Sequence, residues 1–131
     1  MLLLAVIFAS PVATANEDRK PDFSKMKAID HANRIYSDGS HNYLVIFENY
    51  YRKEVSNYVK VPALVAGFSY ISHQCNLDDS QNDKITAYVR IDATQERWTD
   101  VRHAWIVDKD SSSISAVEPK RVYCFNDAWG I

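Results

Sequence analysis

The chain has 131 residues, enough for one domain with a single hydrophobic core. Hydrophobic residues make up 47% and charged residues 24% of it, a balance that excludes a disordered or low-complexity protein. The formal net charge is −2 and the basic residues are dispersed, so the basic stripe that nucleic-acid binding requires is absent and we expect no nucleic-acid partner.

The first fifteen residues, MLLLAVIFASPVATA, have the layout of a secretory signal peptide. An apolar run precedes Pro11 and the small residues Ala13 and Ala15, and we expect cleavage after Ala15. The run is far shorter than the roughly 20 apolar residues that a membrane span needs. We therefore expect a secreted or periplasmic protein that makes no membrane contact after signal removal. Residues 16–22 read as a flexible leader, and residues 23–131 as a single domain.

The two cysteines, Cys75 and Cys124, are predicted to form a disulfide. Export places the chain in an oxidising compartment, where an isolated cysteine pair forms a bridge. By the chain-entropy estimate, a bridge across a loop this long contributes on the order of 4 kcal/mol to stability.

A short amphipathic helix is predicted after the leader. Apolar residues recur at spacings of three and four from Phe23 to Tyr36. Asp22 or Ser24 can accept hydrogen bonds from the free amide groups at the start of this helix. The following stretch, SDGS, ends it.

A second helix of about twenty residues is predicted from Ser40 to Lys60. Ser40 can cap its start, and Pro62 prevents its continuation. A competing interpretation is a strand over YLVIF, residues 43–47, but it leaves the later polar positions unexplained. The apolar positions of the predicted helix are Leu44, Phe47, Tyr51, Val55 and Tyr58.

Beyond Pro62 the hydrophobic period changes to two, which predicts antiparallel strands with one apolar face. The polar stretch NLDDSQND, residues 76–83, predicts a wide exposed hairpin. The expected strands cover residues 68–75, 84–92, 101–108, 113–118 and 121–126. In the third of them, one face is expected to carry Val101, His103, Trp105 and Val107.

These elements predict an α+β fold, in which one or two N-terminal helices pack on a curved antiparallel sheet of four or five strands. A helix with one apolar face needs a partner, and the apolar face of the sheet is the partner available. The disulfide would tie strand 68–75 to strand 121–126.

A long helix, a short extended run ending in VAG and aromatic-rich strands together resemble the cystatins, inhibitors of papain-like cysteine proteases. That family carries a Gln-x-Val-x-Gly hairpin, which Val65 and Gly67 match, with Ala63 at the glutamine position. A later hairpin of the family carries a Pro-Trp pair, for which this chain offers Trp98 with Arg97 in place of proline. The resemblance implies a cystatin-like fold; an NTF2-like arrangement of helix and sheet has the same outline.

The resemblance implies a secreted, non-catalytic inhibitor of cysteine proteases. Such a protein inserts an apolar wedge into a pre-formed cleft of its protein partner. An alternative is a periplasmic immunity or inhibitor protein that neutralises a toxin or hydrolase, or a related module that holds a small ligand in the concave face of its sheet. The partner-binding residues would be Leu64, Val65, Ala66, Gly67 and Trp98.

A third hypothesis is a thiol enzyme that uses Cys75 and His103. The order Cys75, His103 and then Asp108 or Glu118 resembles that of papain-like and transglutaminase-like sites, and RHAWIVD is similar to the histidine-bearing strand of the transglutaminase-like group. That group places its cysteine at the start of a helix, where the helix dipole activates the thiol. Cys75 follows a predicted strand instead, so we expect no catalytic residue and no enzyme.

No metal site or cofactor is expected. The four histidines are not spaced as zinc ligands. The DDSQND stretch, residues 78–83, lacks the central glycine and the terminal glutamate of a calcium-binding loop.

Overall fold

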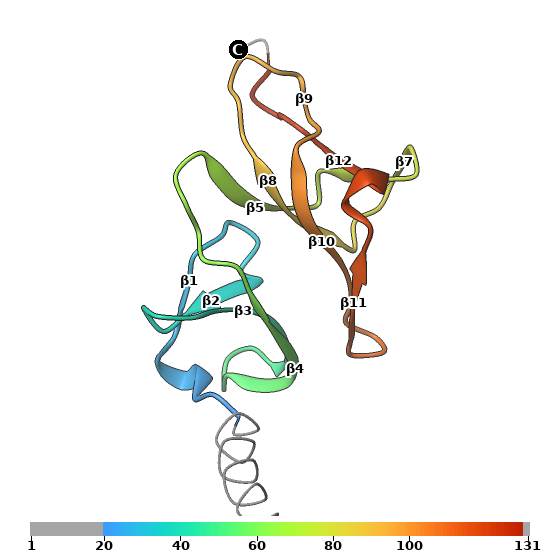
Figure 1. The fold of residues 1–131 in the computed structure, drawn as a ribbon. Helices are drawn as coiled ribbons and strands as arrows, with labels where there is room; N and C mark the ends of the chain where they lie inside the picture. The colour runs from blue at the N-terminus through green and yellow to red at the C-terminus, as the bar shows by residue number, and fades with distance from the viewer. Residues whose placement is uncertain (1–19, 130–131) are drawn as a thin grey trace, which may run out of the picture.

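The computed structural model describes residues 20–129, which fold into three four-stranded antiparallel sheets and two short 3-10 turns (Figure 1). Sheet A, in spatial order, consists of β1 (Lys27–Ala28), β2 (Ile35–Ser37), β3 (Asn42–Asn49) and β4 (Glu54–Val61). Sheet B consists of β11 (Ser113–Val117), β10 (Val101–Asp108), β8 (Ile85–Arg90) and β5 (Phe68–Ser72). Sheet C consists of β7 (Ser80–Gln81), β6 (Cys75–Leu77), β12 (Val122–Phe125) and β9 (Arg97–Trp98). The 3-10 turns are η1 (Phe23–Lys25) and η2 (Pro119–Arg121).

Sheet B lies between the other two sheets, because its two faces belong to two different hydrophobic clusters. On one face, Tyr88 and Trp105 pack with Leu44 of sheet A. On the other face, Ile85 and Val89 pack with the cysteines and Val122 of sheet C. Because β8 is covered on both faces, all of its residues except the last are buried, the polar Thr86 among them.

The outer face of sheet A has its own cover. Phe23 and Met26, in and just after η1, pack against Tyr36 and Val45. Strands β2 and β3 therefore have apolar neighbours on both faces, since Ile35 and Leu44 on the opposite face pack against sheet B.

The predicted α+β fold is wrong, because residues 20–129 contain strands and two 3-10 turns where the two helices were expected. The segment predicted as the second helix is the hairpin of β3 and β4, turned at residues 50–53, where the Lys53 amide donates to the Tyr50 carbonyl (3.1 Å). The rejected strand interpretation of residues 43–47 is the correct one. Because β3 contacts apolar groups on both faces, its two-residue alternation is hidden and the remaining apolar spacing imitates a helix.

The first predicted helix is also wrong. Asp22 accepts a hydrogen bond from the Ser24 amide (3.0 Å), as expected of a cap, but it starts only the single turn η1. Further on, the Asp30 carboxylate accepts from the amides of Arg34 (2.9 Å) and Ile35 (2.8 Å). Aspartate side chains commonly form such bonds to nearby backbone amides, and these bonds stabilise a turn in place of a helix.

The strands predicted beyond residue 84 are confirmed, with β8, β10, β11 and β12 inside the expected ranges. The strand expected at 68–75 is divided into β5 and β6, which belong to different sheets. The expected exposed hairpin is present but tight, because Asp78 and Asp79 form its turn with φ of 51° and 67°. Val101 does not share a face with Trp105, because a β-bulge lies between Val101 and His103.

The predicted disulfide between Cys75 and Cys124 is confirmed. The two residues lie directly opposite each other in the pair of β6 and β12, and both are fully buried. The bridge therefore lies within sheet C and does not join β5 to the last strand. The predicted signal peptide lies outside the described residues. Within residues 20–129, no helix has the length and apolar character that a membrane crossing demands.

Candidate functional site

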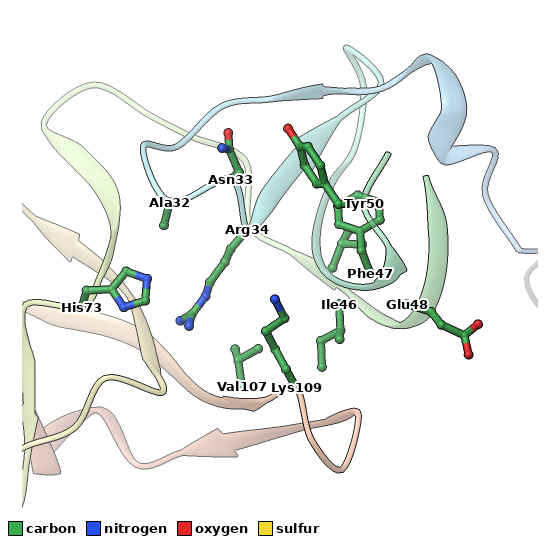
Figure 2. A pocket seen from close by; sticks show the side chains of 11 residues that line it. Ala32, Asn33, Arg34, Ile46, Phe47, Glu48, Tyr50, His73, Val107 and Lys109 are labelled. Atoms are coloured by element: carbon green, nitrogen blue, oxygen red, sulfur yellow. The ribbon is translucent and has the colours of Figure 1, made fainter. Parts of the chain in front are cut away.

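A cleft of about 410 Å³ opens where sheets A and B meet. Figure 2 shows its lining side chains, which come from the loop before β2, from β3 and the turn after it, from the residue after β5, and from the end of β10 and the residue after it. Its apolar lining consists of Ala32, Val45, Ile46, Phe47 and Val107. Its polar lining consists of Asn33, Arg34, Glu48, Tyr50, His73 and Lys109.

Arg34 lies at the centre of the cleft, and its backbone is held from both sides. Its amide donates to Asp30, and its carbonyl accepts from the Val45 amide (2.9 Å). Asn33, immediately before it, adopts a left-handed conformation with φ of 56°, which asparagine tolerates better than most residues. The loop before β2 therefore presents Arg34 in one defined position.

The guanidinium group of Arg34 reaches across to sheet B. Its Nη1 donates to the hydroxyl of Thr86 (2.8 Å), and its Nη2 lies 3.4 Å from the carbonyl oxygen of Asp83. Thr86 is fully buried in β8, and its hydroxyl also pairs with that of Ser72 (2.8 Å), its cross-strand neighbour in β5. Two of the five guanidinium N–H donors are thus engaged, and within residues 20–129 the other three have no hydrogen-bond partner.

The charge of Arg34 has no carboxylate partner within ion-pair distance among residues 20–129. Burial lowers the pKa of the guanidinium from its ordinary value, while the more distant Asp30 and Asp83 raise it. An arginine nevertheless stays protonated in proteins, so the cleft contains a partly desolvated positive charge. An anion that enters the cleft would compensate it.

His73 and Lys109 add two further basic groups. Figure 2 shows both side chains directed toward the space around the Arg34 guanidinium, whereas Glu48 points away from it. His73 has a φ of 69°, a conformation that costs a residue with a Cβ atom about 1 kcal/mol or more. It occupies the crossing from sheet B to sheet C, where the neighbouring Gln74 carbonyl accepts from the Phe125 amide (2.8 Å).

Sequence reasoning did not single out Arg34 or Lys109, and it treated His73 as an isolated histidine. The aspartate and asparagine of DHANR, residues 30–34, favour turns and could have indicated a loop there. No pattern in the sequence connects the three basic residues, because they come from separate elements that only the packing of two sheets brings together.

The predicted partner-binding turn, Leu64–Gly67, lies in the loop between β4 and β5 and is exposed. Leu64 is 45% and Val65 52% exposed. Gly67 has a φ of 87°, which explains the glycine, and space around it is open. Two hydrogen bonds fix the start of this loop to sheet B. The Tyr70 hydroxyl donates to the Pro62 carbonyl, and the Tyr88 hydroxyl donates to the Ala63 carbonyl.

Trp98, the other predicted contact, is half-buried against the cluster that surrounds the disulfide. Its indole N–H donates to the Asp92 carbonyl (2.9 Å), and the Gly67 carbonyl accepts from the Ile91 amide (2.9 Å). Gly67 and Trp98 are therefore hydrogen-bonded to two consecutive residues, Ile91 and Asp92, just after the end of β8. The helix that the cystatin resemblance implies is absent from residues 20–129, so the fold implied by that resemblance is wrong.

The proposed thiol site lacks its nucleophile, because Cys75 is engaged in the disulfide and has no thiolate to offer. His103 stacks on Trp105, with 5.9 Å between the ring centroids, and Asp108 pairs with Lys84 (3.2 Å). In the part of the chain that the structure describes, no three His, Cys, Asp or Glu residues form a group that could hold a metal ion.

Comparison with protein-family models, with curated proteins and with solved structures finds no match to this chain. The function proposed below therefore depends on the chemistry of the cleft and of the exposed loops.

Proposed function

We propose that the chain is an exported, non-catalytic binding protein that holds an anionic group of its ligand in the cleft at Arg34. The observation that carries this proposal is the half-buried guanidinium, which has unused donors and no carboxylate partner among residues 20–129. Charge-assisted hydrogen bonds from a guanidinium to a carboxylate are stronger than neutral ones and can be bidentate. The guanidinium of Arg34 is already partly desolvated and ordered before a ligand arrives. Most of the favourable interaction with an incoming anion therefore appears as binding free energy.

The lining of the cleft favours a carboxylate attached to an apolar body. Three basic side chains lie at one end of the cleft, and the half-buried Phe47 provides apolar surface beside them, with the core residues Ile46 and Val107 behind it. Binding pockets commonly combine an apolar lining with a few polar groups that orient the ligand.

Two further features support an exported protein. The disulfide suits an exported protein, as does the apolar N-terminal segment of the sequence.

The test is an NMR titration of the disulfide-intact protein with phenylacetate, compared with its neutral analogue phenylacetamide. We expect phenylacetate to shift the amide signals of Arg34, His73 and Lys109 and to bind more tightly than phenylacetamide. Arg34→Gln should weaken phenylacetate binding by at least about tenfold.

The matched control is Arg102→Gln, which removes an exposed arginine that is paired with Asp100 (2.7 Å) outside the cleft. It should leave phenylacetate binding unchanged. Equal binding of the acid and the amide, or full affinity in Arg34→Gln, would show that the cleft is not an anion site.

A second candidate function is protein binding through the Leu64–Gly67 turn, either as an inhibitor of a cysteine protease or as a neutraliser of a toxin or hydrolase. The observation that favours it is the exposure of Leu64 and Val65, in a turn whose Gly67 carbonyl accepts from the amide of Ile91, which is itself 41% exposed. The test is inhibition of a papain-like protease, together with a pull-down of exported hydrolases. Gly67→Trp and Trp98→Ala should weaken either interaction, and unchanged inhibition or capture by both variants would exclude the turn as the contact.

A further inference from the structure

We infer that the carboxylate taken by the cleft belongs to an acidic segment of another protein, and that the tip of the β3–β4 hairpin forms the second half of that interface. This inference rests on the proposed function of the cleft and names the class of its partner.

The hairpin tip, residues 50–53, carries an unusual exposed aromatic pair. Tyr51 is 93% and Tyr50 is 47% exposed. The turn is nevertheless ordered by local bonds, because the Asn49 side chain accepts from the Arg52 amide (3.2 Å) and the Tyr50 carbonyl accepts from the Lys53 amide (3.1 Å). Tyr51 therefore projects from a defined turn.

A row of aromatic rings connects this tip to the cleft. The ring centroids of Tyr51 and Tyr50 are 5.6 Å apart, and those of Tyr50 and Phe47 are also 5.6 Å apart, in edge-to-face arrangements. Tyr50 and Phe47 both line the cleft, as Figure 2 shows. A ligand seated at Arg34 that continues past Tyr50 would therefore reach Tyr51.

The charge of the tip matches that of the cleft. Arg52 is exposed, and the Lys53 ammonium lies 5.9 Å from the centroid of the Tyr50 ring. Arg34 and Lys109 line the cleft, and Arg52 and Lys53 lie at the tip, so these two regions together carry four permanent positive charges against the two carboxylates of Glu48 and Glu54, on a chain whose formal net charge is −2. Such local complementarity selects an acidic partner and speeds its encounter.

A small free carboxylate would use the cleft alone and leave Tyr51 without a contact. Tyrosine and arginine are the residue types that dominate protein-protein binding energies, and tyrosine loses little conformational entropy when it is buried. A chain segment is long enough to place one carboxylate at Arg34 and a neighbouring side chain against Tyr51. An acidic protein segment therefore satisfies both the cleft and the tip.

The test uses the full disulfide-bonded protein, phenylacetate, the peptide Glu-Phe-Glu-Leu-Glu and its neutral match Gln-Phe-Gln-Leu-Gln. We expect the acidic peptide to bind more tightly than phenylacetate and to shift the amide signals of Tyr51 and Arg52 as well as that of Arg34. Tyr51→Ser should weaken the acidic peptide by at least about fivefold and leave phenylacetate affinity unchanged.

The control variant is Trp129→Ser, which removes an aromatic residue that is 49% exposed and lies outside the cleft and the tip. It should bind the acidic peptide as the parent does. If Tyr51→Ser keeps full peptide affinity, or if the neutral peptide binds equally well, the inference is wrong while phenylacetate binding still supports the proposed function. If neither phenylacetate nor the acidic peptide binds, both the proposed function and this inference fail.

Discussion

Arg34 and Thr86, 52 positions apart in the sequence, are joined by a hydrogen bond of 2.8 Å between the guanidinium and the threonine hydroxyl. Thr86 is fully buried in the central sheet, whereas Arg34 belongs to the loop that leads into sheet A. The bond therefore fixes the position of the cation in the cleft and also links two layers of the fold.

Thr86→Val should weaken both stability and binding. The substitution keeps the shape of the side chain but removes the acceptor of a charged donor, which costs about 1.5–3 kcal/mol. Urea unfolding measures the free energy of unfolding, and titration with phenylacetate measures the affinity of the less constrained Arg34. Ser72→Ala is the comparison, because it removes only the other partner of Thr86 and leaves the acceptor of Arg34 in place. Equal effects of the two variants would contradict the role given to the Arg34 bond.

Tyr36→Phe should leave stability unchanged or raise it by up to about 1 kcal/mol. The Tyr36 hydroxyl is buried, and although Tyr50 lies near it, no hydrogen bond of ordinary geometry satisfies it among residues 20–129, so its removal relieves a desolvated polar group. Tyr70→Phe is the matched case with the opposite expectation, because the Tyr70 hydroxyl donates to the Pro62 carbonyl. Urea unfolding of the two variants measures the difference, and a clear loss of stability in Tyr36→Phe would count against this assignment.

Stability should fall in alkaline solution, in part through Tyr36. Burial first, and then the nearby Tyr50, raise the pKa of Tyr36 from 10.0 to about 12. The folded state therefore holds this proton more tightly than the unfolded state does. The resulting stability is fully present below about pH 10 and is lost as the pH rises toward about 12. As the pH rises across this range, the midpoint of unfolding should fall less steeply in Tyr36→Phe than in the parent protein. Some decline should remain in the variant, because burial also raises the pKa of Tyr70. Parallel curves for the variant and the parent would contradict the prediction.

Reduction of the Cys75–Cys124 disulfide should lower the free energy of unfolding by on the order of 4 kcal/mol. The bridge closes a long loop that includes most of sheet B, so the reduced unfolded chain gains considerable freedom. Urea unfolding with and without reductant measures the change, and thiol titration of the unfolded, untreated protein should detect no free thiol. Two free thiols in that titration would disprove the bridge.

Gly67→Ala should cost about 1 kcal/mol through backbone strain alone. The φ of Gly67 is 87°, which disfavours a Cβ atom, while no other atom lies close enough to clash with one. Gly67→Asn should cost less than Gly67→Ala, because asparagine tolerates the left-handed region better. The two unfolding free energies decide between strain and steric conflict, since a clash would make the larger asparagine the worse substitution.

Some of this structure could be predicted from the sequence alone. The disulfide followed from two cysteines in a chain with an apolar leader, and β10 followed from alternating residues between clear turn signals. Both depend on local chemistry or on composition, which the sequence records directly.

The fold class and the cleft were decided by tertiary packing. Burial of both faces of β3, under Phe23 on one side and against sheet B on the other, removed the alternation that would have distinguished a strand from a helix. The cleft depends on Arg34, His73 and Lys109, which are dispersed along the sequence and meet only because sheet A packs on sheet B. The hydrophobic pattern of a segment indicates which of its side chains avoid water. It does not indicate which other segment covers those side chains, and that second segment determined both the fold class and the cleft.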